Sequence, residues 1–168
     1  MTSKEWKILK ELKDIYPQLK ITMFTIPEQC SKEWLQTANA IKWIRMAVHG
    51  TDHKYKKSQI PNGKLEYFND WYKAPKWKLT KEEFDKLHEL GYKVATNKTN
   101  PFKGEYVYDD GKEIIKDIHY QLPNGLYTWH GHVQSQAPVN KDSPNGIGDV
   151  LDKFKKHIPL NAEFVWLE

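Results

Sequence analysis

The stretch KLTKEEFDKLHELGYKVATN (78–97) decides the fold, because it leads from an amphipathic helix straight into an apolar strand. Thr80 and Glu83 have the spacing of a capping box, in which each side chain bonds the other residue's backbone amide at the start of a helix. Gly91 is typical of the residue that follows a helix, and YKVATN (92–97) has the composition of a strand. A helix followed at once by a strand is the repeating unit of a parallel sheet.

The same alternation runs along the rest of the chain. The predicted helices cover residues 3–16, 31–41, 78–91 and 145–158. The predicted strands cover residues 19–27, 44–50, 67–74, 92–97, 126–133 and 163–167, with a hairpin over 105–115. This order predicts an α/β fold, either a parallel sheet or a barrel, with its chemistry at the carboxyl ends of the strands. Because no repeat or linker interrupts the pattern, we expect a single domain over 1–168.

Composition excludes several classes of protein. The chain has 168 residues, of which 39% are hydrophobic and 29% charged, and its mean hydropathy is −0.79. No run approaches the roughly 20 apolar residues of a membrane helix, so we expect no membrane association. The N-terminal stretch lacks the apolar core of a secretory signal, and the single cysteine, Cys30, allows neither an internal disulfide nor a thiolate metal cage. A cytoplasmic, reducing compartment is expected.

Charge and aromatic content indicate the kind of ligand. There are 26 Lys and Arg residues against 22 Asp and Glu, and the densest basic run, HKYKK (53–57), is short. This mild, dispersed excess does not favour nucleic acid as a partner. Aromatic residues make up 13% of the chain, which fits either an aromatic core or a surface that binds sugars. Composition leaves both interpretations open.

Two histidine pairs lie at predicted strand ends. His49 and His53 form an H-x-x-x-H pair after IRMAVHG (44–50), a spacing that on a helical turn places both imidazoles on one side, as a divalent metal requires. His130 and His132 point the same way if their strand is extended. The alternative for each pair is exposed histidines with no shared role.

Four segments in this order resemble the NodB-type polysaccharide deacetylase family across the whole chain. They are ITMFTIP (21–27), AVHGTDH (47–53), YKAPKW (72–77) and LYTWHGH (126–132). The resemblance implies an incomplete (β/α) barrel that lacks the family's first strand.

The resemblance also implies roles for individual residues. His49 and His53 would bind a divalent metal, with zinc expected, and His130 or His132 would act as the general acid. Lys73 stands where the family has an arginine in an R-x-P motif, and it lacks that residue's planar fork. The aromatic residues that would line a carbohydrate groove are Trp71, Tyr72, Trp77 and Trp129.

A second departure concerns the family's Asp-Asp pair, which supplies a general base and a third metal ligand. The strand that carries the pair precedes the first helix in the family and is missing here. Asp109 and Asp110 could replace it, although Asp110-Gly111 already has the character of a turn. We therefore predict a metal-dependent, deacetylase-like protein for acetylated carbohydrate that is weak or inactive as an isolated chain. The alternative is a non-catalytic glycan-binding or structural module of viral or mobile-element origin.

The missing strand predicts a partner. In the family it lies between the strands that correspond to 20–26 and 163–167. Without it both would expose unpaired backbone groups, and such edges attract another chain. We expect a second polypeptide or a second copy of this protein to complete the sheet.

Overall fold

A computed structural model describes residues 3–97, 100–108, 119–121, 127–129, 152, 154–156 and 158–167. The chain divides into two compact units. The sheet unit comprises Lys20–Tyr108 and Trp166–Glu168, and the terminal unit comprises Met1–Leu19 and Asp109–Val165. The single domain expected over 1–168 stays a prediction.

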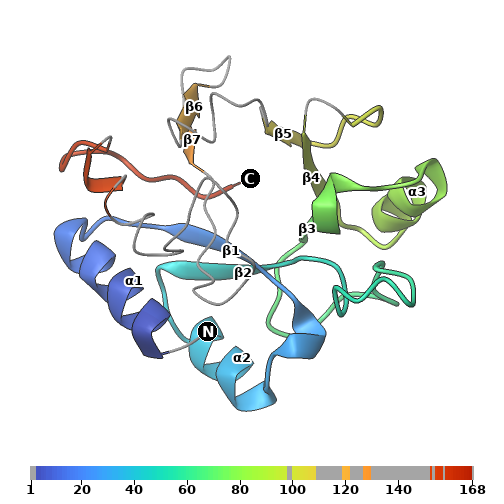
Figure 1. Ribbon diagram of the computed structural model, residues 1–168, viewed down its shortest axis with the longest axis horizontal. Coiled ribbons are helices and arrows are strands. Elements are labelled where there is room, and N and C mark those ends of the chain that lie inside the picture. Colours follow the sequence, from blue (N-terminus) through green and yellow to red (C-terminus); the bar gives the residue numbers. More distant parts are fainter. Residues whose placement is uncertain are drawn as a thin grey trace. The chain divides into compact units, whose positions relative to one another are not determined.

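The sheet unit is built on five parallel strands. They are β1 (Ile21–Thr25), β2 (Ile44–Val48), β3 (Trp71–Lys73), β4 (Lys93–Asn97) and β5 (Tyr106–Tyr108). Their order in the sheet is β1-β2-β3-β4-β5, and every neighbouring pair is parallel (Figure 1). The strand order follows the chain order, as expected for strands joined by crossovers of one hand. The predicted α/β class with a parallel sheet is confirmed.

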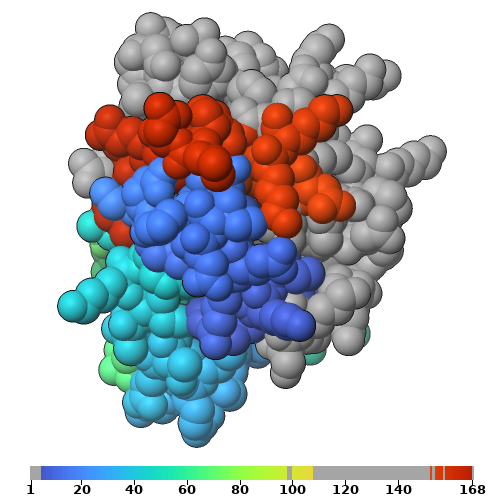
Figure 2. Space-filling view, turned by 90° about the vertical axis from the view of Figure 1, so that its left-hand side faces the viewer, coloured from blue at the N-terminus to red at the C-terminus, as the bar shows by residue number. Residues whose placement is uncertain are grey.

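Two α-helices of this unit begin at side-chain caps. Ser31 accepts a hydrogen bond from the Trp34 amide at the start of α2 (Lys32–Asn39), whose surface is light blue in Figure 2. The predicted capping box is present at α3 (Lys81–Glu89), where Thr80 and Glu83 bond each other's backbone amides. Short 3₁₀ turns, η1 (Pro27–Gln29) and η2 (Pro75–Trp77), follow β1 and β3.

Both faces of the sheet are covered. On one face Val48, Tyr72 and Val94 are fully buried and pack in a cluster with Leu87 of α3. The cluster of the other face contains Ala47, Trp71 and Ala95, with Phe24 and Leu167 packed against it. Strands buried on both faces are near-continuous apolar runs, which explains why IRMAVHG does not alternate between polar and apolar residues.

The terminal unit is organised around an aromatic cluster. Its helix α1 (Ser3–Ile15) buries Leu9 and Leu12 and is followed by the buried Tyr16. The Tyr16 ring lies edge-on to Phe154 at 5.0 Å and to Phe164 at 6.0 Å. The Tyr16 hydroxyl donates a 2.7 Å hydrogen bond to the carbonyl of Ile158, so burying this polar ring leaves no unpaired hydroxyl.

Two predicted strands differ from the structure. The strand expected over 126–133 is β7 (Tyr127–Trp129), which pairs antiparallel with β6 (His119–Gln121) in a separate two-stranded sheet. Residues 122–126 are too few for the crossover that parallel pairing requires, so the antiparallel arrangement follows from chain length. The prediction of a parallel strand there is wrong.

The prediction of a strand over 163–167 is also wrong. These residues are described without strand pairing, and the stretch passes from the terminal unit to the sheet unit after Val165. Its last residues contact side chains of the sheet instead. The Trp71 indole donates to the Leu167 carbonyl at 3.0 Å, and Arg45 lies over the Trp166 ring. Consequently 163–167 does not pair with β1, which is an edge of the five-stranded sheet.

The predicted hairpin over 105–115 is described only up to residue 108, where β5 pairs parallel with β4. Asp109 and Asp110 lie outside the described residues, as does most of the helix predicted over 145–158.

Candidate functional site

The candidate site lies where β2 and β3 end. His49 directly follows β2, and its backbone amide donates to the Thr25 carbonyl at 2.9 Å, which continues the ladder with β1. The Nδ1 atom of His49 lies 2.9 Å from the carbonyl oxygen of Lys73 in β3. A carbonyl oxygen can only accept, so Nδ1 carries a proton, and Nε2 is the nitrogen that has the lone pair whenever the ring is neutral. This is the tautomer that a metal-ligating histidine adopts when a carbonyl fixes its other nitrogen.

The second histidine lies close to the first. The ring centroids of His49 and His53 are 5.0 Å apart, and the ring planes are tilted by 53°. The residues between them form bends instead of the helical turn that the spacing suggested, and His53 has a φ of 62°. The pKa of His53 is below its ordinary value, first because of burial and further because of the positive charges of Lys76 and Lys73. His53 therefore keeps the neutral form that binds metals at more acidic pH than an exposed histidine does.

One amide side chain holds the loop that carries His53. The Gln59 Oε1 atom accepts hydrogen bonds from the backbone amides of Thr51 at 3.2 Å and His53 at 3.0 Å. Its Nε2 atom donates to Asp52 Oδ1 at 2.8 Å. This bond, together with the Lys54 amide, lowers the pKa of Asp52. Sequence reasoning missed Gln59, because a glutamine in an irregular segment matches no motif.

Gly50 lets this loop touch the one that follows β3. Its φ is 68°, and a Cβ atom there would lie 2.6 Å from Pro75 Cγ and 2.8 Å from Gln59 Oε1. Real Cβ atoms essentially never approach so closely. The glycine is therefore required both by its backbone conformation and by contact with η2.

Lys73 is a buried cation between aromatic rings. Lys73 is 7% exposed, and its Nζ atom lies 5.1 Å from the ring centroids of both Phe24 and Trp77. The ring faces attract the ammonium group and partly replace its lost hydration. Its carbonyl orients His49, so Lys73 belongs to the same group of residues as the histidine pair.

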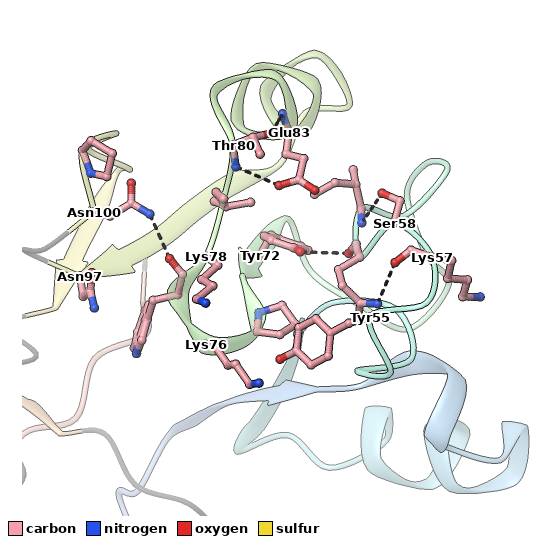
Figure 3. Close-up of a pocket in the computed structure, with 16 residues that line it drawn as sticks. Tyr55, Lys57, Ser58, Tyr72, Lys76, Lys78, Thr80, Glu83, Asn97 and Asn100 are labelled. Atoms are coloured by element: carbon pink, nitrogen blue, oxygen red, sulfur yellow. Dashed lines mark hydrogen bonds between the residues drawn. The ribbon is translucent and has the colours of Figure 1, made fainter.

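A cleft of about 700 Å³ adjoins this group (Figure 3). The Tyr55 ring lines it and lies 5.5 Å from the His53 ring. The buried Tyr72 hydroxyl donates to the Gln59 carbonyl at 2.9 Å, which joins the wall of the cleft to the histidine loop. The residues that line the cleft are Tyr55, Lys57, Ser58, Gln59, Ile60, Tyr72, Pro75, Lys76, Trp77, Lys78, Leu79, Thr80, Glu83, Asn97, Asn100 and Pro101.

Unusual backbone conformations gather around the cleft. Positive φ angles occur at five described non-glycine residues, and four of them are His53, Tyr55, Lys76 and Trp77. Such conformations cost about 1–3 kcal/mol each and persist only where the surroundings impose them. Their concentration in these two loops is one reason to treat this region as the candidate functional site.

The predicted site residues are only partly brought together. His49, His53, Lys73 and Trp77 lie in one group, and Tyr72 lines the adjoining cleft. Trp71 does not line the cleft and packs on the sheet with Ala47 and Ala95, in a cluster that Trp77 also contacts. Trp129 is described only as part of β7, and His130 and His132 lie outside the described residues.

The histidine pair fits part of a metal site. Two imidazoles from one loop, one of them oriented by a carbonyl, are suitable ligands for zinc. Within the described ranges no third His, Cys, Asp or Glu joins them in a group that could hold a metal ion. The nearby Asp52 carboxylate is bonded to Gln59 and to the Lys54 amide.

The fold and this group of residues define an α/β protein with a five-stranded parallel sheet and a histidine pair at the end of β2. Comparison with protein-family models, with curated proteins and with solved structures finds no match. Every helix among the described residues is too short or too polar to cross a membrane.

We predict that Gly50→Ala destabilises the protein by at least about 1 kcal/mol. The alanine would have a strained positive φ, and its Cβ atom would overlap Pro75. Gly63→Ala is the matched control, because a Cβ atom there meets nothing within 4 Å, and it should change stability by less than about 0.5 kcal/mol. Urea unfolding of both variants measures the difference. Equal stabilities would show that the two loops are not in contact.

We also predict that His53 titrates below the ordinary histidine value of 6.5, because burial opposes its protonation. A lowered pKa means that the unfolded chain takes up a proton more readily than the folded one does. The contribution of His53 to stability is therefore complete above the unfolded pKa and is lost as the pH falls towards the folded one. An NMR titration of the metal-free protein measures this midpoint, and a value above 6.5 would contradict the burial of His53.

Proposed function

We propose that this chain is a NodB-like, metal-dependent deacetylase-like protein that binds acetylated carbohydrate. In this proposal His49 and His53 hold one divalent metal ion, with zinc expected, and the sheet unit is part of an incomplete (β/α) barrel. The observation that carries the proposal is the orientation of His49 by the Lys73 carbonyl with a second imidazole 5.0 Å away.

The location of the pair supports the same proposal. In parallel α/β folds, ligands bind outside the carboxyl ends of the strands, and His49 follows β2 at that edge of the sheet. When bound there, a divalent metal would polarise an acetyl carbonyl and lower the pKa of a water molecule.

The chain's own residues would position the substrate. The Trp77 ring would present an apolar surface to a sugar or an acetyl methyl group, and the buried Lys73 ammonium behind it would contribute positive charge. His130 or His132 is proposed to protonate the leaving group, in line with the family resemblance.

The catalytic set is incomplete in the described part of the chain, because no carboxylate joins the two histidines as a metal ligand. We propose that a second polypeptide or a second copy of this chain adds a strand at β1, the edge of the sheet. Replacement by Asp109 or Asp110 is the alternative. A non-catalytic glycan-binding or structural module is the second candidate function, and it is supported by the two histidines having no third ligand among the residues that the structure describes.

The proposal predicts that His49→Ala and His53→Ala each weaken zinc binding by at least about 100-fold, since each removes one ligand from a small set. His88→Ala is the control, because His88 lies on α3, where its imidazole pairs with Glu105. Calorimetric titration with zinc chloride measures the affinities. The metal site is refuted if the parent protein binds no zinc or if both variants bind it as well as the parent does.

The proposal further predicts that the isolated chain deacetylates an N-acetylglucosamine oligomer slowly or not at all. A missing general base alone removes about 10²–10⁴-fold in rate. Acetate release in the presence of zinc measures the rate. Rapid turnover by the chain alone would mean that its own residues supply the carboxylates.

A further inference from the structure

We propose that the cleft lined by Tyr55, Trp77, Lys76 and Lys78 binds an anionic group of the carbohydrate, so that the substrate class is an acetylated acidic glycan. This inference rests on the proposed function for the carbohydrate itself. The additional claim, which concerns the negative charge, comes from the side chains of the cleft.

Positive charge exceeds negative charge along the walls of the cleft. Three lysines, Lys57, Lys76 and Lys78, line it together with a single acidic residue, Glu83. Lys57 is already paired with Glu28 through a 2.7 Å contact. Glu83 accepts a hydrogen bond from the Thr80 amide in the capping box, which directs its carboxylate to the start of α3.

The other two lysines of the cleft are accessible to a ligand. Lys76 and Lys78 are exposed, and neither forms an ion pair within the described part of the chain. The Lys76 Nζ atom lies 4.7 Å from the Tyr55 ring centroid, so the ring holds the ammonium group at the rim of the cleft (Figure 3). An ammonium group on an aromatic face keeps its full charge and can still contact an anion.

Aromatic and amide groups of the same cleft suit a sugar. Tyr55 is 46% exposed, so its ring can pack against the apolar face of a pyranose, and Trp77 lines the cleft from the neighbouring loop. Asn100 lines the cleft and is held in place, donating to the Trp77 carbonyl at 3.1 Å and accepting from the Phe102 amide at 2.8 Å. A rigid amide next to aromatic rings gives direction to hydrogen bonds with hydroxyl groups.

A glycan fits the cleft better than a nucleic acid does. Nucleic-acid binding depends on several phosphate contacts along a continuous basic track. Here two lysines lie at a cleft of about 700 Å³, a volume within the usual range for small-ligand sites. The local charge is therefore sufficient for one or two carboxylate or sulfate groups on a sugar chain.

The test compares acetylated oligosaccharides of equal length that differ in charge. Hyaluronan carries a carboxylate on every second sugar, chondroitin sulfate adds sulfate, and chitooligosaccharide is neutral. Calorimetry with the full chain should show tighter binding of one or both acidic oligomers than of the neutral one. Raising the salt concentration from about 50 to 500 mM should weaken binding of the acidic oligomers only, because salt screens exposed charges.

Charge variants then assign the effect to the cleft. The double variant Lys76→Gln/Lys78→Gln should bind the preferred acidic oligomer roughly fivefold more weakly, in keeping with two exposed ionic contacts. Lys76→Arg/Lys78→Arg should retain binding. The control Lys32→Gln/Lys86→Gln removes the same charge outside the cleft and should bind like the parent protein.

Three results would overturn the inference. They are equal or tighter binding of the neutral oligomer at low salt, equal losses in the cleft and control variants, and tighter binding of a single-stranded oligonucleotide than of either acidic oligomer. The salt series needs no variant, so it decides even if the glutamine variant fails to fold. Zinc binding by the parent protein separates the two proposals, since acidic-glycan binding without zinc uptake would refute the metal site and leave this inference intact.

Discussion

The hydrogen bond between His49 Nδ1 and the Lys73 carbonyl is the contact on which the candidate site depends. Strands β2 and β3 have one pair of register partners, Val48 and Tyr72, so the backbone ladder between them is short. The imidazole extends this junction by one residue at the edge where the loops begin. It therefore links the geometry of the sheet to the orientation of a side chain that can bind a metal.

Much of the sheet unit could be predicted from the sequence, because its local signals agree with the tertiary fold. The capping box at Thr80 and the apolar run 44–50 each predict one element, and the structure contains both. The prediction failed at 163–167, where β-rich composition suggested a strand. That stretch passes between the two units, and Trp166 and Leu167 make side-chain and carbonyl contacts to Arg45 and Trp71 in place of a strand ladder. Composition cannot distinguish an extended segment with a strand partner from one without it.

The candidate site was predictable only as far as strand ends could be recognised. The pair of histidines was found because His49 follows an apolar strand, and Lys73 was found through its place before Ala74-Pro75. Gln59 was not, although it holds the backbone of Thr51 and His53, because its role arises from a bend that returns the chain to the strand end. Backbone hydrogen bonds to a distant amide leave no periodic signal in the sequence.

The left-handed residues around the cleft have a consequence for how a ligand would associate. His53 and Tyr55 in one loop, and Lys76 and Trp77 in the other, are held in conformations that free peptides rarely visit. Gly50 and Pro75 bring these two loops into close contact. The loops would therefore lose little chain entropy when a molecule enters the cleft, and more of the contact energy would remain as affinity.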